Sequence, residues 1–424
     1  MNKIITRYSC LMFLAAALTA CSHNDEPEED PIAERTVLVY MSAENDLSSF
    51  ALSDLDEMKQ ASRSLKDNQQ LVAYIDRADT IPPFYARIKD GAFVDSVSVS
   101  ESSSADPAVL EAALSYVRTH YPSRSYGLVL WGHASGWLVS NDSIPYNHSR
   151  AYGGDTETNS ASRTIKHWMN IPSMAVAVNK GMGGTPLKFI MGDCCSFGCV
   201  EVAYELRHVA EYVIGSPAEV PDDGAPFDLV IPEMFSQREN FYQAIIDEYY
   251  QFYKEEYENR PQRYYNTTVG DLKGYSVPLA AVKTSELDQL ASATSQLLAS
   301  IHDRLTPTGD LDFTPNVYYA MYSSYRYSYD MYQMLKNNTS ATEFNTWAAA
   351  FNKAVPYRVT STRWLTGYSQ LGREMVNFDD YASDCGVLSM FFPRTIYKST
   401  NPNWNLAIRK FQWNNSIHWE DYDW

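Results

Sequence analysis

The sequence predicts an α/β fold in which a mostly parallel sheet carries helices on both faces, followed by a mainly helical C-terminal region. Three observations predict this class. Short apolar, β-branched runs of strand length recur through the first half of the chain. Segments with the apolar spacing of a helix separate these runs, an alternation typical of parallel sheets covered on both faces. Beyond about residue 236, long amphipathic or aromatic helical segments replace them.

The predicted elements follow one another in a regular order. Buried strands are predicted at 35–41, 71–75, 126–131, 187–191 and 212–216. Helices are predicted at 45–60, 104–120, 165–178 and 200–211, the second of them capped by Asp106 with Pro107 in its first turn. Residues 82–100 indicate short antiparallel strands, whereas 138–160, rich in Asn, Ser and Gly, indicate a long loop.

The C-terminal part of the sequence, 236–424, is harder to interpret. Helices are predicted at 241–257 and 285–305, and a late strand at 387–392. Seven tyrosines fall between Tyr318 and Tyr332, and no role follows from their pattern. We therefore divide the chain at residue 235, with the α/β core at 34–235 and the mainly helical region after it.

Composition excludes several classes of protein. The 424 residues are 45% hydrophobic and 20% charged, a balance that excludes a disordered chain. Asp and Glu number 52 against 34 Lys and Arg, a net charge of -18, so no nucleic-acid partner is expected, because phosphate binding needs a basic footprint. Six Cys are too few for a disulfide framework of this length.

The N-terminus has the features of a targeting segment. Two basic residues precede an apolar run at 11–18 that is too short to span a bilayer, so residues 1–20 are predicted to be a signal peptide. The residues Leu18-Thr19-Ala20-Cys21 resemble the lipobox of bacterial lipoproteins, which implies acylation of Cys21; an ordinary secretory signal with an incidental Cys is the alternative.

Residues 21–33 are acidic and interrupted by proline, and we expect a solvated tether. An acidic run after the lipid-bearing Cys also resembles the surface-export signals of some Gram-negative lipoproteins, with a plain spacer as the alternative. The expected location is the outer membrane, reached through a lipid anchor at Cys21, with the protein either exposed on the cell surface or facing the periplasm.

A histidine and a cysteine follow two successive strands of the predicted sheet. His133 comes directly after the third strand, within Trp131-Gly132-His133-Ala134, and Cys195 ends Asp193-Cys194-Cys195 after the fourth. Ligands of parallel sheets bind at the carboxyl ends of the strands, which lie on one edge. We therefore expect His133 and Cys195 to be neighbours.

This pair suits nucleophilic catalysis. A free thiol, with a pKa near ~8.5, is mostly protonated at neutral pH, and an imidazole can take its proton and later protonate a leaving amine. The backbone N–H groups of Ala134 and Cys195 are candidates for stabilising an oxyanion. The alternatives are a hydrogen-bonded loop histidine, and thiols that are buried or disulfide-bonded. A zinc site is disfavoured, because Cys194, Cys195 and Cys199 lack the paired spacing of zinc ligands.

These motifs together resemble the clostripain family of cysteine peptidases, in the clan of caspases, gingipains and legumain. The family has a strand ending in Trp-Gly-His-Gly, a strand ending in Asp-Ala-Cys and a helix with Glu-Val-Ala-Tyr-Glu-Leu, which is also the sequence at 201–206 here. The first strand and its turn, at 40–47, have a family counterpart too. The resemblance implies a caspase-like fold for 34–235 and hydrolysis of protein or peptide substrates.

The resemblance also implies roles for individual residues. Cys195 would be the nucleophile, His133 the general acid and base, and Asp193 a carboxylate near the base of the substrate pocket that selects Arg or Lys; a helix N-cap is the alternative for Asp193. Arg150 is the nearest candidate for self-cleavage, with an ordinary surface arginine as the alternative. No cofactor or metal is expected. Calcium enters only by resemblance to some family members, since no EF-hand pattern is present.

Two departures from the family pattern leave other functions open. Ala134 replaces a Gly, which matters if that position needs a positive φ, and Cys194 replaces an Ala beside the nucleophile. A catalytically silent lipoprotein that binds peptide or glycan through its aromatic C-terminal half is the main alternative. A redox protein using Cys194, Cys195 and Cys199 ranks last, because the spacing is not Cys-x-x-Cys.

Overall fold

The computed structural model describes residues 32–138, 151–158, 164–259, 275–305, 311–314, 316–322, 325–369, 372–378 and 382–422. The predicted signal peptide, most of the tether, the candidate lipidation site Cys21 and the candidate cleavage site Arg150 lie outside the described residues. The segment Ile32–Trp424 forms one compact unit. Among the described helices, none is both long enough and apolar enough to cross a membrane.

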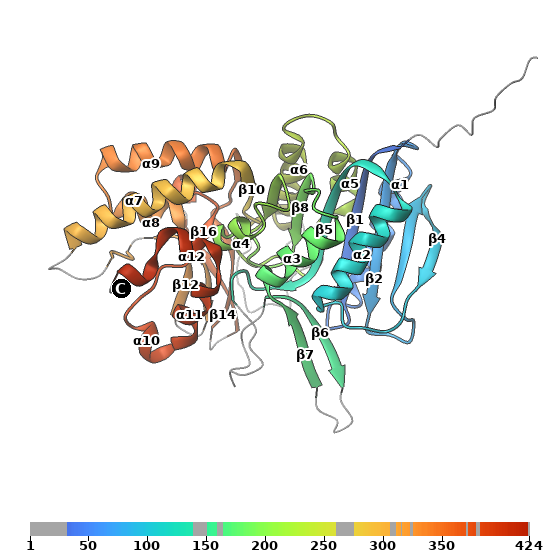
Figure 1. The fold of residues 1–424 in the computed structure, drawn as a ribbon, viewed down its shortest axis with the longest axis horizontal. Helices are drawn as coiled ribbons and strands as arrows, with labels where there is room; N and C mark the ends of the chain where they lie inside the picture. The colour runs from blue at the N-terminus through green and yellow to red at the C-terminus, as the bar shows by residue number, and fades with distance from the viewer. Residues whose placement is uncertain are drawn as a thin grey trace, which may run out of the picture. The chain divides into compact units, whose positions relative to one another are not determined.

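A parallel sheet forms the centre of this unit (Figure 1). Its strands run in the order β9-β8-β5-β1-β2, and every neighbouring pair is parallel. Their bounds are Ala33–Ala43 for β1, Gln69–Arg77 for β2, Ser123–Ala134 for β5, Phe189–Asp193 for β8 and Tyr212–Gly215 for β9. These are the five predicted buried strands, and their apolar, β-branched sequences fit a sheet covered on both faces.

Antiparallel strands extend this sheet at both edges. On the β2 side, β3 (Phe84–Lys89) and β4 (Ala92–Ser98) form the antiparallel pieces predicted for 82–100. On the β9 side, β10 (Leu279–Lys283) and β13 (Tyr357–Val359) come from the C-terminal part of the chain. The region after residue 235 therefore completes the central sheet.

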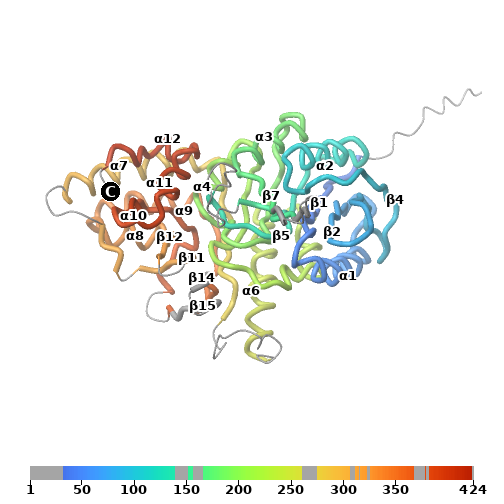
Figure 2. The backbone as a smooth tube through the Cα atoms, turned by 90° about the horizontal axis from the view of Figure 1, so that it is seen from below, coloured from blue at the N-terminus to red at the C-terminus, as the bar shows by residue number. Residues whose placement is uncertain are grey.

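Helices cover both faces of the sheet, as the sequence predicts (Figure 2). Side chains alternate along β1, so that Leu38 and Tyr40 face one core and Val37 and Val39 the other. The first face packs on α2 (Pro107–His120), α3 (Ile171–Gly181) and α4 (Val200–Glu205). The second packs on α1 (Phe50–Ser62), α5 (Phe227–Met234) and α6 (Phe241–Asn259).

The expected long loop at 138–160 and the expected helix start at 165 are wrong in part. The chain forms a hairpin there, with β6 at Tyr152–Thr158 and β7 at Thr164–Met169, and α3 begins only at Ile171. β-branched and aromatic residues in β7 favour a strand, and a proline in the first turn marks the true helix start. The hairpin joins the sheet where β6 pairs with the end of β5, opposite His133.

The C-terminal region differs from the expectation of helices with one late strand, because its described residues contain seven strands. β10 and β13 extend the central sheet, and the other five form a second sheet in the order β15-β14-β11-β12-β16. The Tyr-rich segment supplies two of them, since tyrosine is favoured in strands. The late strand predicted at 387–392 is only two residues long. The bounds are Tyr318–Tyr322 (β11), Tyr325–Asp330 (β12), Arg363–Ser369 (β14), Gly372–Asn377 (β15) and Ser389–Met390 (β16).

Helices flank this second sheet. They include the predicted helix at 285–305, which is observed as α7 at Leu287–Leu305. The others are α8 (Met331–Asn337), α9 (Ala341–Ala354), α10 (Tyr397–Thr400), α11 (Pro402–Ala407) and α12 (Gln412–Ile417). Residues of α4, α7, α9 and α12 belong to one continuous core, so the two sheets share their hydrophobic interior.

Candidate active site

His133 and Cys195 lie at neighbouring strand ends on one edge of the central sheet. β5 and β8 are adjacent and parallel, and the last paired residues are Trp131 and Asp193. His133 comes two positions after Trp131, and Cys195 comes two positions after Asp193. Adjacent strands are ~4.8 Å apart, so the two residues follow neighbouring strand ends on the same edge of the sheet.

Two glycines bring the backbone segments around these residues together. Gly132 has a φ of +141°, and a Cβ on it would lie 2.8 Å from the carbonyl oxygen of Ser42. Gly136 has a φ of +64°, and a Cβ on it would lie 2.6 Å from the carbonyl oxygen of Ser196. The backbone before His133 therefore contacts the end of β1, and the loop after His133 contacts the turn after Cys195, each at a distance that only glycine permits.

The turn after Cys195 is strained and held in place. Ser196 has a φ of 57°, a left-handed conformation that costs a non-glycine residue roughly 1–2 kcal/mol. Its N–H donates to the Ala218 carbonyl at 2.8 Å, and the Gly198 N–H donates to the Ser216 carbonyl at 2.7 Å. The segment after β9 thus fixes the direction in which Cys195 leaves the sheet.

The second sheet also contributes to this turn. The Ser389 N–H donates to the Gly198 carbonyl at 3.0 Å. The Phe391 N–H donates to Glu201 Oε1, in the first turn of α4, at 2.8 Å. The C-terminal region therefore supports the loop that carries Cys195.

The described cysteines differ in accessibility. Cys194, Cys199 and Cys385 are buried and Cys195 is half-buried. Burial raises the pKa of Cys194 and of Cys199 well above the usual range, so both are poor nucleophiles and poor redox groups. Cys195 Sγ accepts a hydrogen bond from the Val220 N–H at 3.4 Å. Of the described thiols, Cys195 is the one placed for chemistry.

His133 has a partner that the sequence analysis did not identify. Its Nε2 lies 2.8 Å from Asp46 Oδ1, just after β1, and this hydrogen bond is the largest cause that lowers the pKa of Asp46. A carboxylate that accepts from Nε2–H leaves Nδ1 as the proton acceptor. The 40–47 motif contains Asp46, but nothing in its spacing indicates a contact with a residue 87 positions away.

Asp193 is buried, and each of its carboxylate oxygens accepts one hydrogen bond. Its Oδ1 accepts from the Tyr249 hydroxyl at 2.8 Å and its Oδ2 from the Ala225 N–H at 3.0 Å. Burial raises its pKa to about 6, and these two bonds oppose the rise. The N-cap alternative is wrong, because the residue that caps α4 is Cys199.

Further carboxyl groups surround Asp193. A Cβ on Gly224 would lie 2.8 Å from Asp193 Oδ2 and 3.3 Å from Asp54 Oδ2, so two carboxylates face the same point of the backbone. Burial first, and then the charge of Asp193, raise the pKa of Asp54 to about 9. Glu57, one turn further along α1, has a pKa raised to about 7, mainly by burial. We call Asp54, Glu57 and Asp193 the α1–β8 cluster.

Ala134 is compatible with a role for its backbone. It is not among the residues with a positive φ, so its methyl group causes no strain where the family has glycine. The Ser135 N–H donates to the Ala151 carbonyl, next to β6, at 3.0 Å. Since successive N–H groups of an extended chain point in opposite directions, the Ala134 N–H points away from β6.

A parallel sheet of this topology, with a thiol and an imidazole at adjacent strand ends, defines a cysteine peptidase of the caspase-like fold. The model of the clostripain family matches residues 39–424, and the chain therefore belongs to the clostripain family. This membership favours the peptidase over the silent binding lipoprotein.

Solved structures have a similar fold. A secreted C11 cysteine protease from Bacteroides thetaiotaomicron, in complex with an irreversible peptide inhibitor, is 27% identical, with a TM-score of 0.73 over 92% of this chain and 100% of that chain. An inactive zymogen C11 protease from Parabacteroides distasonis is 24% identical, with a TM-score of 0.71 over 92% of this chain and 99% of that one. A sequence search of curated proteins found no match.

Proposed function

We propose that this peptidase hydrolyses peptide bonds through Cys195 as nucleophile and His133 as general acid and base. The observation that carries the proposal is the register of β5 and β8, which puts both residues two positions beyond the last strand pair. No other described cysteine combines partial exposure with a place at this sheet edge.

The reaction follows from the contacts of each group. His133 takes the thiol proton through Nδ1, and the sulfur of Cys195 attacks the substrate carbonyl carbon. The Val220 N–H, 3.4 Å from Sγ, stabilises the thiolate. Charge develops on the carbonyl oxygen, which the N–H groups of Ala134 and Cys195 stabilise.

His133 then completes the cycle. It protonates the departing amine, and the acyl group remains on sulfur as a thioester. Water, deprotonated by the same imidazole, hydrolyses this thioester and restores the thiol. Asp46 orients the imidazole through its 2.8 Å contact with Nε2, as a positioning residue.

We propose further that the peptidase cleaves after Arg or Lys. Asp193 lies two residues before Cys195, and its charge contributes to the raised pKa values of Asp54 and Glu57. A guanidinium or ammonium group would relieve that repulsion. A carboxylate has about four lone-pair sites, so the two bonds to Asp193 leave it able to accept from a substrate.

The chain's location and maturation are proposals of the same kind. Lipidation at Cys21 anchors the protein to the outer membrane through the acidic tether, and Arg150 is a site of self-cleavage. Their support is the lipobox resemblance and the basic residue nearest His133 in the loop that follows it. If Cys21 carries the anchor, Cys21→Ser should move the protein from the membrane pellet to the soluble fraction; unchanged fractionation would contradict the anchor.

The deciding experiment compares two neighbouring cysteines. We expect Cys195→Ala to lower the turnover of fluorogenic peptides ending in Arg or Lys by at least ~10³-fold. Cys194→Ala is the matched control, since Cys194 faces the core, and it should retain most of the activity. Peptides ending in Asp or Leu test the selectivity, and a gel of the same samples tests cleavage at Arg150.

Equal activity of wild type and Cys195→Ala would overturn the proposed nucleophile. Turnover that depends on Cys195 but prefers Asp or Leu would keep the dyad and reject the role of Asp193.

A further inference from the structure

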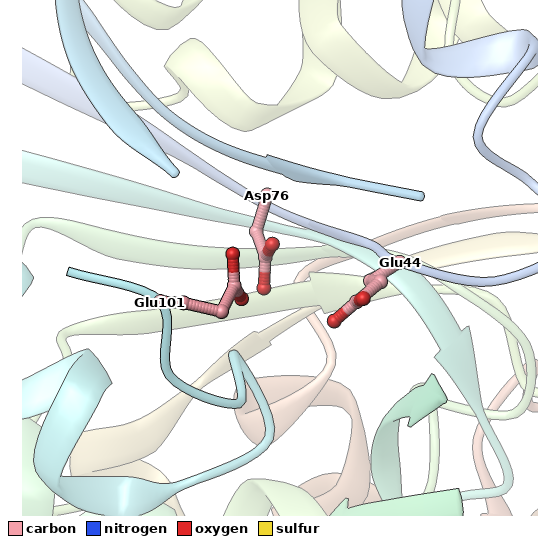
Figure 3. Close-up of side chains that lie close together, drawn as sticks. All are labelled: Glu44, Asp76 and Glu101. Atoms are coloured by element: carbon pink, nitrogen blue, oxygen red, sulfur yellow. The ribbon is translucent and has the colours of Figure 1, made fainter. Parts of the chain in front are cut away.

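A second group of carboxyls gathers at the same sheet edge, on the opposite face from the α1–β8 cluster. Glu44 follows β1, Asp76 is near the end of β2, and Glu101 lies in the segment before α2. Figure 3 shows the three carboxyl groups pointing toward one another. Asp155 of β6, which is buried, hydrogen-bonds the carboxyl of Glu44.

Asp76 has an oxygen with no hydrogen-bond partner. The residue is 1% exposed, and its Oδ2 is buried without a donor. Ser104 hydrogen-bonds the Asp76 carboxyl, and Oδ2 is the oxygen that remains without a donor. A buried carboxylate oxygen without a hydrogen-bond donor destabilises the folded state. The Asp76 carboxyl, to which this oxygen belongs, points toward the carboxyls of Glu44 and Glu101 (Figure 3).

The spacing of the three groups fits a cation. Each residue offers one carboxylate oxygen, and these oxygens all lie within 4.8 Å of one another. Oxygen ligands ~2.4 Å from a bound Ca²⁺ are at most ~4.8 Å apart. Among the described residues, no lysine or arginine forms an ion pair with Glu44, Asp76 or Glu101, so no side chain there supplies the missing positive charge.

We propose that Glu44, Asp76 and Glu101, with Asp155 beside them, bind a hard divalent cation of the calcium class. The ligands are carboxylate oxygens alone, which such cations prefer over nitrogen or sulfur ligands. Without a cation the carboxyls are held near one another at a cost, because like charges repel and Asp76 Oδ2 has no donor. The bound ion satisfies Asp76 Oδ2 and neutralises the repulsion.

The location gives this site a consequence for His133. Glu44 is two residues before Asp46, which hydrogen-bonds the His133 imidazole. Asp155 is two residues after Gly153, which pairs with His133 across β5 and β6. A cation that joins Glu44 to Asp155 therefore fixes both backbone segments against which His133 is positioned. We expect the bound ion to order the catalytic edge of the sheet without contacting the substrate.

Binding is tested without any need for catalysis. Purified protein, stripped with EDTA, is titrated with CaCl₂ and separately with MgCl₂ while its melting temperature is recorded; terbium, with tyrosine-sensitised luminescence, serves as a direct probe. We expect Ca²⁺ to raise the melting temperature by several degrees. Glu101→Gln, an exposed position, should weaken the apparent Ca²⁺ affinity at least ~10-fold.

Asp76→Asn should change the melting temperature in different ways with EDTA and with Ca²⁺. In EDTA it should melt at or above the wild-type temperature, because a buried repulsion is removed, and its response to Ca²⁺ should be lost. Asp67→Asn is the matched control: Asp67 is an exposed carboxylate paired with Lys89 at 2.9 Å, and its variant should respond to Ca²⁺ as wild type does. If Asp76→Asn does not fold, Glu101→Gln still decides the question.

Two outcomes would overturn the site. One is a wild-type melting temperature and terbium signal unchanged by millimolar cation, and the other is an undiminished response in Glu101→Gln. An increase with Mg²⁺ and none with Ca²⁺ would overturn the assignment to the calcium class. Because these readouts need no turnover, a protein that binds Ca²⁺ but cleaves no peptide would reject the proposed function and keep the site.

Discussion

The two carboxyl clusters at the C-terminal edge of the sheet have similar chemistry but different surroundings. In the α1–β8 cluster, both oxygens of Asp193 accept hydrogen bonds, from Tyr249 and from the Ala225 N–H. On the other face, Asp76 is as deeply buried but keeps one oxygen without a donor. Burial raises the pKa of carboxyls in both clusters. Hydrogen-bond satisfaction, and not burial, is what separates them.

This difference bears on how each cluster would meet a positive charge. A carboxylate whose oxygens are already bonded stays in place when no ligand is present, which suits a pocket that a substrate side chain enters and leaves. An unpartnered oxygen is stabilised only while an ion is bound, which suits a resident cation. We therefore assign a transient cation to the α1–β8 cluster and a resident one to Glu44, Asp76 and Glu101.

Among the predictions that compare the two clusters, the largest expected effect is a loss of activity. Asp193→Asn keeps the shape of the side chain but removes its charge, and we expect kcat/KM for Arg and Lys peptides to fall ~100-fold or more, because the cationic side chain loses a charge-assisted partner in a buried site. Added Ca²⁺ should not restore this activity. The measurement is kcat/KM for Arg, Lys and Leu peptides, with and without Ca²⁺.

A matched comparison comes from the other cluster. Glu101→Gln also removes one carboxylate, but its loss of activity should shrink as Ca²⁺ is raised, since only the affinity for the ion is weakened. An unchanged preference for Arg and Lys in Asp193→Asn would contradict the assignment of the α1–β8 cluster to the substrate.

The parts of this arrangement that the sequence predicts are those that depend on local pattern. The apolar runs of β1, β5 and β8 identify the parallel sheet, and the rule for strand ends then places His133 and Cys195 after neighbouring strands. The tyrosine-rich strands and the β6–β7 hairpin were missed, because their polar and aromatic residues bury a face only against partners distant in sequence.

Both carboxyl clusters escape sequence analysis for a related reason. Asp54 and Asp193 come from a helix and a strand far apart in the chain, and Glu44, Asp76 and Glu101 come from three separate segments. No spacing rule joins such residues, because the sheet topology alone brings them together. A single carboxylate next to a strand end is also common on a protein surface, so of these residues only Asp193 is singled out, and that by its place in the family motif.

The smallest expected effect concerns stability and pH in the α1–β8 cluster. The pKa of Asp54 is raised to about 9 in the folded chain, first by burial and then by the charge of Asp193, against ~3.9 for an unperturbed Asp. The folded state therefore binds a proton that the unfolded state releases between these values. The stabilisation that this bound proton gives the folded state is complete below pH ~3.9 and is lost progressively as pH rises toward 9.

We expect Asp54→Asn to weaken this dependence. Its melting temperature should fall less than that of wild type between pH 5 and pH 9, by a few degrees, while the asparagine oxygen still accepts from the Trp131 indole N–H that Asp54 now binds. Asp56→Asn, an exposed position on the same helix that pairs with Lys59, should follow the wild-type curve. Thermal melts in EDTA across this range keep the second cluster free of cation. Parallel curves for wild type and Asp54→Asn would mean that Asp54 is already ionised at neutral pH, and that the α1–β8 cluster carries one more negative charge for a substrate than we infer.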